Sequence, residues 1–585
     1  MFKQEQTFIE EKIKAILEAE GIQTEPLIWS RIPFVGHWGI TTSFFKLAAR
    51  NKHFHPEMDV KKRAAFIADI VCQKLALGDN FEKSESVNGY LNIYFDTRVF
   101  ANRTINTILT DKADYGRGAA GKKVMVEFSQ PNTHKAFHVG HLRNMVLGDA
   151  VCRMLEFAGY EVIRANYIGD IGLHVIKWLW NYIKYHHGET PPAKGVTRWM
   201  GDLYAEAIRR LEENPQFEDE VRTLFLKWDV KDEEILKLWE KTRKWSLDAF
   251  NAVYDLLDIR FDKVYFESEM EDAGKEVVEQ LIKAGIAKDE RPNGAVIVDL
   301  DELLHTENKL RVLVILRSDG TSLYSTKDLA LAIRKFEEYS LDQSVYVIDV
   351  RQSLYMQQIF KTLELLGYEW AKNCYHLAYE IVNLPGNVTI ASREGAIVLL
   401  EDLIDEAEKR ARMIVDEKNP ELSEQTKSDV ARKVALGALK YSLLSRDNTK
   451  VITFDWDSAM DVNGQAAPYI QYAYVRANSI LRKVHFAIPE KAESSYILTE
   501  AEVELVDILS RFSQEVEKGA QEMRPLLIAN YAYDLAKAFS NFYNLCPVLN
   551  AEKHMRNFRL ALTAASRQVI KNSLDLLGIQ VPEVM

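Results

Sequence analysis

Hydrophobic positions recur with different periods along the chain, and each change of period marks a change of architecture. Near the amino terminus, residues 8–19 and 60–77 carry apolar side chains at helical spacing, whereas residues 90–95 alternate as a half-buried strand does. A glycine-rich stretch follows at residues 114–121 and is typical of a linker. The pattern predicts a small α+β domain over residues 1–115.

Short apolar strands alternate with helices from residue 122 onward. The predicted strands cover residues 124–128, 161–166, 295–299, 312–316 and 344–348, and the predicted helices include residues 142–158 and 355–366. Such alternation predicts a doubly wound, largely parallel sheet that binds its ligand at the carboxyl ends of the strands. Because residues 185–292 are mostly helical and charged, we expect a helical insertion within a sheet domain spanning residues 116–410.

Strand signals nearly vanish in the last third of the chain. Helical periodicity covers residues 434–444, 469–483, 503–517 and 528–543. These segments predict an all-α bundle over residues 411–585. At 585 residues the chain is too long for one hydrophobic core, so a multidomain α/β protein is expected.

Composition narrows the class of protein. No apolar stretch reaches the roughly eighteen residues of a membrane span, and the first residues are too polar for a signal peptide, so we expect a cytoplasmic protein without membrane contact. The cysteines are far apart, which predicts reduced thiols rather than a disulfide framework or a zinc site. The net charge of −12 argues against bulk attraction for nucleic acid, although charges nearly balance from Lys440 onward.

The main chemical feature lies between the strand at residues 124–128 and the helix that follows. His138 and His141, three residues apart at a helix start, are expected to project together beside free backbone N–H groups, where a phosphate is held. Gly140 would let an adenine or ribose approach the backbone. A capping or packing role for the histidines is the alternative. A metal site that also uses His134 is disfavoured, because no carboxylate or cysteine stands at matching spacing.

In this setting, His138-Val-Gly-His141 resembles the His-Ile-Gly-His signature of class I aminoacyl-tRNA synthetases. The surrounding run from Val126 to Asp149 is similar to arginyl-tRNA synthetases in particular. Three distant segments agree in the correct order, namely Tyr324-x-Thr326-Lys327-Asp328-x-Ala330, the run from Ala467 to Arg476, and the chain end from Cys546 to Met585. The resemblance spans the whole chain.

The resemblance implies a Rossmann-like catalytic domain and a two-step ligase reaction. The family joins the carboxylate of arginine to the α-phosphate of ATP, releases pyrophosphate, and passes arginine to the terminal adenosine of tRNA(Arg). Catalysis needs no protein nucleophile, so it must come from positioning and charge stabilisation, with His138 and His141 donating to phosphate oxygens. We expect ATP to arrive with Mg²⁺, no tightly bound cofactor or protein-held metal ion, and a monomer.

The second signature of the class, a Lys-Met-Ser-Lys loop, departs from its pattern here. Ser392 remains and is expected to contact ATP, Arg393 replaces the second lysine, and the first lysine is absent. The resemblance implies that Lys135, just before the first signature, compensates. We therefore expect Lys135 and Arg393 to share the phosphate charge, with a solvated loop lysine as the alternative for Lys135.

Selection of arginine makes a simple physical demand, because a planar guanidinium with five donors calls for carboxylates that accept in its plane. By resemblance, Asp328 and Glu127 are these carboxylates, and Tyr324 contributes its hydroxyl. Asn132 and Gln352 are implied to hold the α-amino group of the substrate.

Two of these assignments compete with structural roles. Glu127 lies within an apolar strand, which ordinarily indicates an exposed sheet edge. A ligand cation is favoured instead, because a buried carboxylate without a partner is costly. Asp328 also fits the N-cap of a helix over residues 329–336. Near Gln352, Tyr355 stands where many family members have a histidine.

Contacts with tRNA are expected at both ends of the chain. Tyr469, Tyr472 and Arg476 share one helix face, and an aromatic ring beside a guanidinium is a platform for unstacked bases. We assign Tyr472 and Arg476 to tRNA and Tyr469 to packing, with Phe539 and Tyr543 as further tRNA candidates. By resemblance, the amino-terminal domain contacts the tRNA elbow.

Two functions from other classes rank below arginylation. A different nucleotidylyltransferase with the same histidines would not need a large helical carboxyl-terminal domain. A synthetase-like RNA binder without catalysis would lack His138, His141 or the guanidinium carboxylates, and all of these are present.

Overall fold

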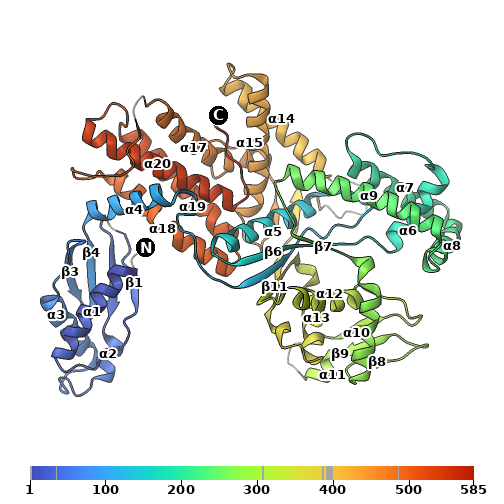
Figure 1. Cartoon of the computed structure of the whole chain (residues 1–585), viewed down its shortest axis with the longest axis horizontal. Helices are drawn as coiled ribbons and strands as arrows, with labels where there is room; N and C mark the ends of the chain where they lie inside the picture. Colours follow the sequence, from blue (N-terminus) through green and yellow to red (C-terminus); the bar gives the residue numbers. More distant parts are fainter. Residues whose placement is uncertain (1–2, 35, 306–308, 385–387, 390–398, 485–486) are drawn as a thin grey trace.

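The computed structural model describes residues 3–34, 36–305, 309–384, 388–389, 399–484 and 487–585. The amino-terminal domain and a helical insertion lie at opposite ends of its longest axis (Figure 1). The parallel sheet and a carboxyl-terminal helical bundle lie between them. The multidomain α/β architecture predicted from the sequence is therefore confirmed.

The amino-terminal domain is an antiparallel sheet, ordered β1-β2-β4-β3, covered by helices. Its elements are α1 (Lys3–Ala19), β1 (Trp29–Arg31), β2 (Gly39–Ser43), α2 (Phe45–Arg50), α3 (Val60–Lys74), β3 (Phe81–Val87) and β4 (Tyr90–Phe95). The two predicted helices and the predicted strand are all present. The following helix, α4 (Thr97–Asp111), leaves this sheet and packs against the carboxyl-terminal bundle.

This domain is fixed to helix α18 (Glu500–Glu522) of the bundle by one buried carboxylate. Asp507 accepts hydrogen bonds from the guanidinium of Arg31 at 2.7 Å and from Nε1 of Trp38 at 2.9 Å. The hydroxyl of Tyr115 donates to the carbonyl of Leu509 at 3.1 Å. The two ends of the chain therefore meet in a polar contact that holds their relative orientation.

The central sheet is parallel throughout, in the order β12-β11-β5-β6-β7. Its strands are β5 (Lys123–Glu127), β6 (Glu161–Ile168), β7 (Lys263–Phe266), β11 (Gln343–Asp349) and β12 (Cys374–Tyr379), and the helices that follow β5 and flank β11 are α5 (Val139–Phe157), α12 (Tyr324–Tyr339) and α13 (Ser353–Leu365). The chain runs outward in one direction from β5 and in the other from β11. The predicted doubly wound sheet is confirmed, and its switch point lies between these two strands.

Two predicted strands belong to a different sheet. β9 (Val296–Asp299) and β10 (Val312–Leu316) pair antiparallel with each other, and β8 (Lys288–Asp289) extends this small sheet. The prediction that they join the parallel sheet is wrong. Side chains along both strands alternate between more and less buried, as in a sheet with one solvated face, whereas β5 is buried over most of its length. The sequence prediction also missed β7, which joins the main sheet from within the predicted insertion.

The insertion between β6 and β7 is helical, as expected. It consists of α6 (Leu173–Tyr185), α7 (Val196–Glu213), α8 (Glu218–Asp229) and α9 (Glu233–Leu256), while α10 (Glu271–Lys283) and α11 (Leu300–Leu304) follow β7. Aromatic side chains fill its core, where Trp178 is fully buried and stacks on Tyr182 with 5.2 Å between ring centroids. The insertion is thus a packed lobe with a core of its own.

The last third of the chain is the predicted helical bundle. Its main helices are α14 (Leu400–Lys418), α15 (Glu424–Leu444), α16 (Trp456–Ala459), α17 (Ala467–Arg482), α18, α19 (Pro525–Leu545) and α20 (Lys553–Leu576), and β13 (Val382–Leu384), β14 (Val388–Thr389) and β15 (Ile452–Thr453) form a short sheet at its border. The four helical segments predicted here are confirmed. Across the described residues, no helix combines the length and apolarity that a membrane crossing requires.

Candidate active site

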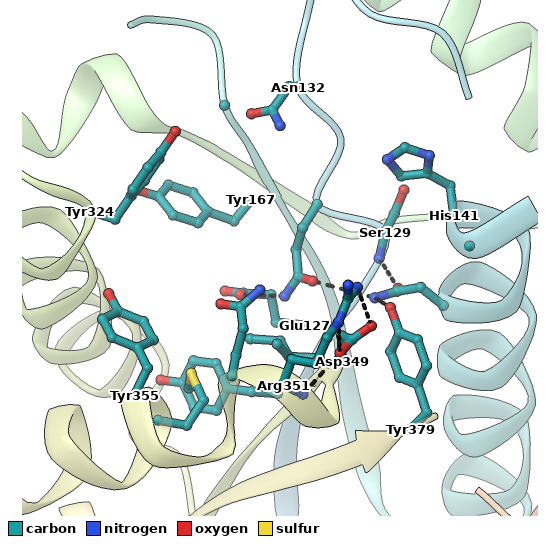
Figure 2. A pocket seen from close by; sticks show the side chains of 18 of the residues that line it. Glu127, Ser129, Asn132, His141, Tyr167, Tyr324, Asp349, Arg351, Tyr355 and Tyr379 are labelled. Atoms are coloured by element: carbon teal, nitrogen blue, oxygen red, sulfur yellow. Dashed lines mark hydrogen bonds and ion pairs between the residues drawn. The ribbon is translucent and has the colours of Figure 1, made fainter. Parts of the chain in front are cut away.

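A cavity of about 980 Å³ opens at the carboxyl ends of β5, β6 and β11. It lies where the order of the strands reverses, which is where a doubly wound sheet binds its ligand. Figure 2 shows Tyr324 and Tyr355 extending from helices on one side, with His141 at a helix start on the other. The fold thus brings together residues that are more than 200 positions apart in the sequence.

The two signature histidines cap helix α5 reciprocally. His138 is the N-cap residue, and its Nδ1 accepts a hydrogen bond from the backbone N–H of Gly140 at 3.1 Å. His141 reaches back, and its Nδ1 accepts from the backbone N–H of His138 at 3.2 Å. With Nδ1 accepting, the proton of each neutral ring sits on Nε2, which is then a donor.

Both rings are held in the neutral form. Burial, reinforced by the nearby charge of Lys135, lowers the pKa of His138 to about 4. Burial, together with the neighbouring His138 and Lys135, lowers the pKa of His141 well below its ordinary value. Each histidine therefore offers a hydrogen bond at neutral pH without adding a positive charge.

This capping confirms the alternative role considered for the two histidines and corrects one expectation about the helix start. The backbone N–H of Gly140, expected to be free for a ligand, is already bonded to His138. A Cβ atom on Gly140 would lie 2.9 Å from the His138 ring, so the glycine gives clearance to that imidazole. Gly140 nevertheless lines the cavity, as its predicted place beside ATP requires.

His134 does not converge with the other two histidines. It is fully buried, its Nε2 lies 2.9 Å from the hydroxyl of Thr242, and its ring packs edge-on against Trp178 at 4.9 Å. These contacts tie the signature loop to the insertion. No cluster of three side chains able to hold a metal ion occurs within the described part of the chain.

Four carboxylates line the cavity. Asp349 is paired with Arg351 at 2.8 Å, and of the other three, Glu127, Glu267 and Asp328, two have a buried lysine as partner. Glu127 is paired with Lys335, and the amide of Gln130 donates to its other oxygen at 2.8 Å. Glu267, from the turn after β7, is paired with Lys327 at 2.7 Å. The interpretation that favoured a ligand cation as the reason for the burial of Glu127 is therefore wrong, because Lys335 supplies the missing charge.

Glu267 is a cavity residue that the sequence prediction missed. Glu267 directly follows the strand Lys263–Phe266. This strand is only four residues long and lies within the segment that the sequence predicts to be a helical insertion. Burial raises its pKa, and the ion pair with Lys327 opposes this effect. Only the arrangement of the strands places Glu267 beside the other carboxylates.

Asp328 has a different environment from Glu127 and Glu267. Helix α12 begins at Tyr324 and its N-cap residue is Leu323, so Asp328 lies in the second turn and the predicted alternative of an N-cap role is wrong. The hydroxyl of Tyr355 donates to Oδ2 of Asp328 at 2.5 Å. Burial raises the pKa of this carboxyl to about 7, although the bond from Tyr355 works in the opposite direction.

The remaining predicted substrate residues also line this cavity, namely Asn132, Tyr324 and Gln352. Asn132 follows a turn in which Ser129 and Gln130 have positive φ angles of 77° and 48°. Such strained backbone costs about 1–3 kcal/mol per residue and is concentrated at functional sites. A Cβ atom on Gly169 would lie 2.2 Å from the Asn132 side chain, so the approach of these two strand ends requires the glycine.

The residues expected to share the phosphate charge are not seen together. Lys135 is absent from the cavity lining and lies over the ring of Tyr204 in α7, with Nζ 4.9 Å from its centroid. Its charge still acts on both signature histidines. Ser392 and Arg393 lie outside the described residues.

A second group of predicted residues meets on the helical bundle. The guanidinium of Arg476 lies 4.4 Å from the ring of Tyr472 and 5.1 Å from that of Tyr543, and both rings are exposed. Tyr469 packs against Tyr533, as predicted. Phe539 has no exposed surface, so the prediction of a tRNA contact there is wrong: this helix turn faces the core.

Comparisons with known proteins cover the whole chain. The family described as "tRNA synthetases class I (R), catalytic domain" matches residues 104–456, and "DALR anticodon binding domain" matches residues 470–585. The chain is 39% identical to the arginine–tRNA ligase of Bdellovibrio bacteriovorus, over 85% of this chain and 86% of that protein. It is 37% identical to that of Clostridium perfringens, over 90% and 92%. The Thermus thermophilus arginyl-tRNA synthetase structure aligns with a TM-score of 0.77, 29% identity and coverage of 99% and 100%.

Proposed function

The chain belongs to the arginyl-tRNA synthetase family of class I and is an arginine–tRNA ligase, and on that premise we propose how its residues divide the reaction. The observation that carries the proposal is the cavity at the switch point. Neutral histidines line one side of it, and carboxylates line the other. One side suits the phosphates of ATP, and the other suits a guanidinium.

In the first step, a carboxylate oxygen of arginine attacks the α-phosphorus of ATP. The bond from that phosphorus to the bridging oxygen breaks, and pyrophosphate leaves with the electron pair. We assign Nε2–H of His138 and of His141 to the phosphate oxygens, where negative charge develops. One such donor contributes about 3–4 kcal/mol to transition-state stabilisation in other enzymes.

Recognition of arginine is assigned to the opposite wall. Asp328 and Glu267 accept from the guanidinium, with the hydroxyl of Tyr324 as a further partner. Asn132 and Gln352 hold the α-amino group. Both oxygens of Glu127 are engaged, one by Lys335 and the other by the amide of Gln130, so we assign Glu127 to the wall that orients the substrate. Glu267 is bonded to Lys327 through Oε1, which leaves Oε2 for the guanidinium.

The phosphate charge has a second set of partners in the proposal. ATP enters as its Mg²⁺ complex, Ser392 and Arg393 approach it from the second signature, and Lys135 adds positive charge near the histidines. Lys135 is held over an aromatic ring in this structure, so its contact with ATP requires a change of side-chain rotamer. In the second step, the 2′-hydroxyl of the terminal adenosine attacks the arginyl carbonyl carbon, and AMP leaves.

The tRNA is read on the helical bundle, where we assign Tyr472, Arg476 and Tyr543 to anticodon bases. An aromatic ring offers a stacking face to any base, and the guanidinium adds charge for the phosphate backbone. The amino-terminal domain is assigned to the tRNA elbow. We further propose that the enzyme acts as a monomer in the cytoplasm.

ATP–pyrophosphate exchange tests the proposal directly. We expect exchange with arginine in the presence of tRNA(Arg), and background exchange with lysine or the uncharged analogue citrulline. Asp328→Asn is expected to raise the KM for arginine at least a hundredfold. Equal exchange with citrulline, or an unchanged KM in Asp328→Asn, would contradict the assignment of the guanidinium wall.

A further inference from the structure

The carboxylates of the arginine pocket differ in whether a cation faces them. Glu127 has the ammonium of Lys335, and Glu267 has that of Lys327 at 2.7 Å. Within the described residues, no cationic side chain forms an ion pair with Asp328. A guanidinium that enters the pocket therefore finds one carboxylate whose charge is not compensated.

Helix α12 supplies both the compensating lysines and the uncompensated carboxylate. Lys327 and Asp328 are neighbours on it, and Lys335 lies two turns after Asp328 on the same face. The lysines point to the strands and are almost fully buried, whereas Asp328 keeps part of its surface open to the cavity. Their backbone positions are therefore fixed relative to one another.

The only hydrogen bond to the Asp328 carboxylate within the described residues comes from helix α13. The hydroxyl of Tyr355 donates to Oδ2 at 2.5 Å, and the Tyr355 side chain also lines the cavity (Figure 2). Each oxygen of a carboxylate accepts about two hydrogen bonds. The bond from Tyr355 thus fixes one oxygen and leaves Oδ1 as an open acceptor.

We propose that Tyr355 is a positioning residue that favours the ionised form of Asp328 and directs it into the pocket before arginine binds, so that the guanidinium meets a preorganised acceptor. The proposal rests on the assignment of Asp328 to the guanidinium. A donor to the ionised form favours that form, and a carboxylate fixed before binding loses less conformational entropy when the ligand arrives.

The other titratable groups that face Asp328 are Glu127, Glu267, Lys335, Tyr167 and Tyr324. Glu127 and Glu267 each have a lysine partner, and Lys335 acts on Asp328 through space from its own helix. Burial raises the pKa values of Tyr167 and Tyr324, so these phenols stay protonated near neutrality. Within this set, Asp328 is the unpaired group whose ionisation falls near pH 7.

The experiment measures the KM for arginine in ATP–pyrophosphate exchange from pH 5.5 to 8.5, with saturating ATP and tRNA(Arg). In the unaltered enzyme we expect KM to fall as pH rises and to level off above a midpoint near 7. Tyr355→Phe removes the donor while keeping the ring. The midpoint is expected to move to higher pH, and KM at pH 6.5 to rise about two- to tenfold with kcat preserved.

Tyr346→Phe is the matched control. Within the described residues its hydroxyl makes no hydrogen bond to Asp328, and its ring lies under the ammonium of Lys335, with Nζ 4.1 Å from the centroid. The control is expected to leave the midpoint in place. A thermal midpoint for each variant separates a lost hydrogen bond from a lost fold.

Asp328→Asn separates this proposal from the assignment on which it rests. If Asp328→Asn removes the pH dependence but Tyr355→Phe leaves the midpoint unchanged, the role of Tyr355 is wrong and the arginine site stands. If Asp328→Asn keeps the KM of the unaltered enzyme, the arginine assignment and the role of Tyr355 are both wrong. A shifted midpoint in Tyr355→Phe together with the loss of pH dependence in Asp328→Asn supports both.

Discussion

The ammonium of Lys335 is paired with the carboxylate of Glu127, and neither side chain has more than 4% of its surface exposed. Lys335 comes from α12 and Glu127 from β5, so the pair joins the arginine wall to the central strand of the sheet. A buried pair adds little net stability, but its loss on one side leaves an uncompensated charge. The pocket is therefore sensitive to substitution at either end.

Lys335→Met is expected to lower the free energy of unfolding of the catalytic domain by about 3–5 kcal/mol, because Glu127 is left buried without its cation. Urea unfolding followed by tryptophan fluorescence measures the change. The double variant Lys335→Met with Glu127→Gln is expected to recover much of the loss. The surface pair Lys372–Glu369 gives the control, since Lys372→Met should not alter stability measurably. A single variant as stable as the unaltered enzyme would contradict the argument.

Asp328→Asn is expected to stabilise the arginine-free enzyme at alkaline pH. The pKa of Asp328 is about 7 in the folded protein, above its ordinary value of 3.8, so the folded state binds the proton more tightly than the unfolded state. The free energy of unfolding therefore falls as pH rises between these values. At pH 8 the variant is expected to be more stable by about 2–4 kcal/mol, and at pH 4 the difference should nearly vanish. Thermal unfolding of both proteins at the two pH values measures this difference, and equal thermal midpoints at pH 8 would contradict the prediction.

His138→Ala is expected to lower kcat for ATP–pyrophosphate exchange about a hundred- to a thousandfold while leaving the KM for arginine nearly unchanged. In the proposed mechanism the neutral ring donates to phosphate and has no role on the guanidinium side. Because its pKa is about 4, the contribution of His138 should persist from pH 8 down to about pH 5. His53→Ala, on the distant amino-terminal domain, is the control. Loss of the His138 contribution already at pH 6.5 would show that the ring is charged in the working enzyme.

Tyr472→Ala is expected to raise the KM for tRNA(Arg) about 5- to 100-fold in aminoacylation, which corresponds to one lost base stack. The matched variant is Phe539→Leu on a neighbouring helix. Since Phe539 is fully buried, that variant should lower the thermal midpoint and leave the KM for tRNA unchanged. The opposite pattern would move the anticodon surface to another face of the bundle.

Asp507→Ala is expected to loosen the amino-terminal domain. The variant leaves the Trp38 N–H without its acceptor and removes the carboxylate partner of Arg31, which keeps its bond to the Ser510 hydroxyl, at a cost of about 1–3 kcal/mol. Limited proteolysis should then cut faster near residues 114–121. A cleavage rate equal to that of the unaltered enzyme would mean that other contacts fix the domain.

The sequence predicts the fold well where periodicity alone decides it. The helices of the bundle and the strands at residues 124–128 and 344–348 are found where expected, because their burial patterns are long and regular. Strand membership is a different question. Residues 296–299 and 312–316 are strands as predicted, but only hydrogen-bond partners decide which sheet a strand joins. The four residues of β7 carry too little pattern to be recognised at all.

The site was predictable as far as single residues carry its chemistry. Apart from Lys135, the predicted residues from Glu127 to Gln352 line one cavity. Pairing was not predictable. Neither Lys335 nor Glu267 stands in a motif, and the partners of Glu127 and Lys327 follow only from the packing of α12 against the strands.

Helix α12 carries two lysines and one aspartate of the pocket on a single stiff segment, which has a consequence for protein engineering. A substitution that changes one of these charges leaves the other two in place, so the net charge of this wall can be preserved only if the three positions are changed together. An attempt to redirect the enzyme toward a neutral amino acid should therefore exchange the helix face together with Glu127 and Glu267. Replacing one member of the Glu127–Lys335 or Glu267–Lys327 pair alone would leave its partner buried without a counter-charge.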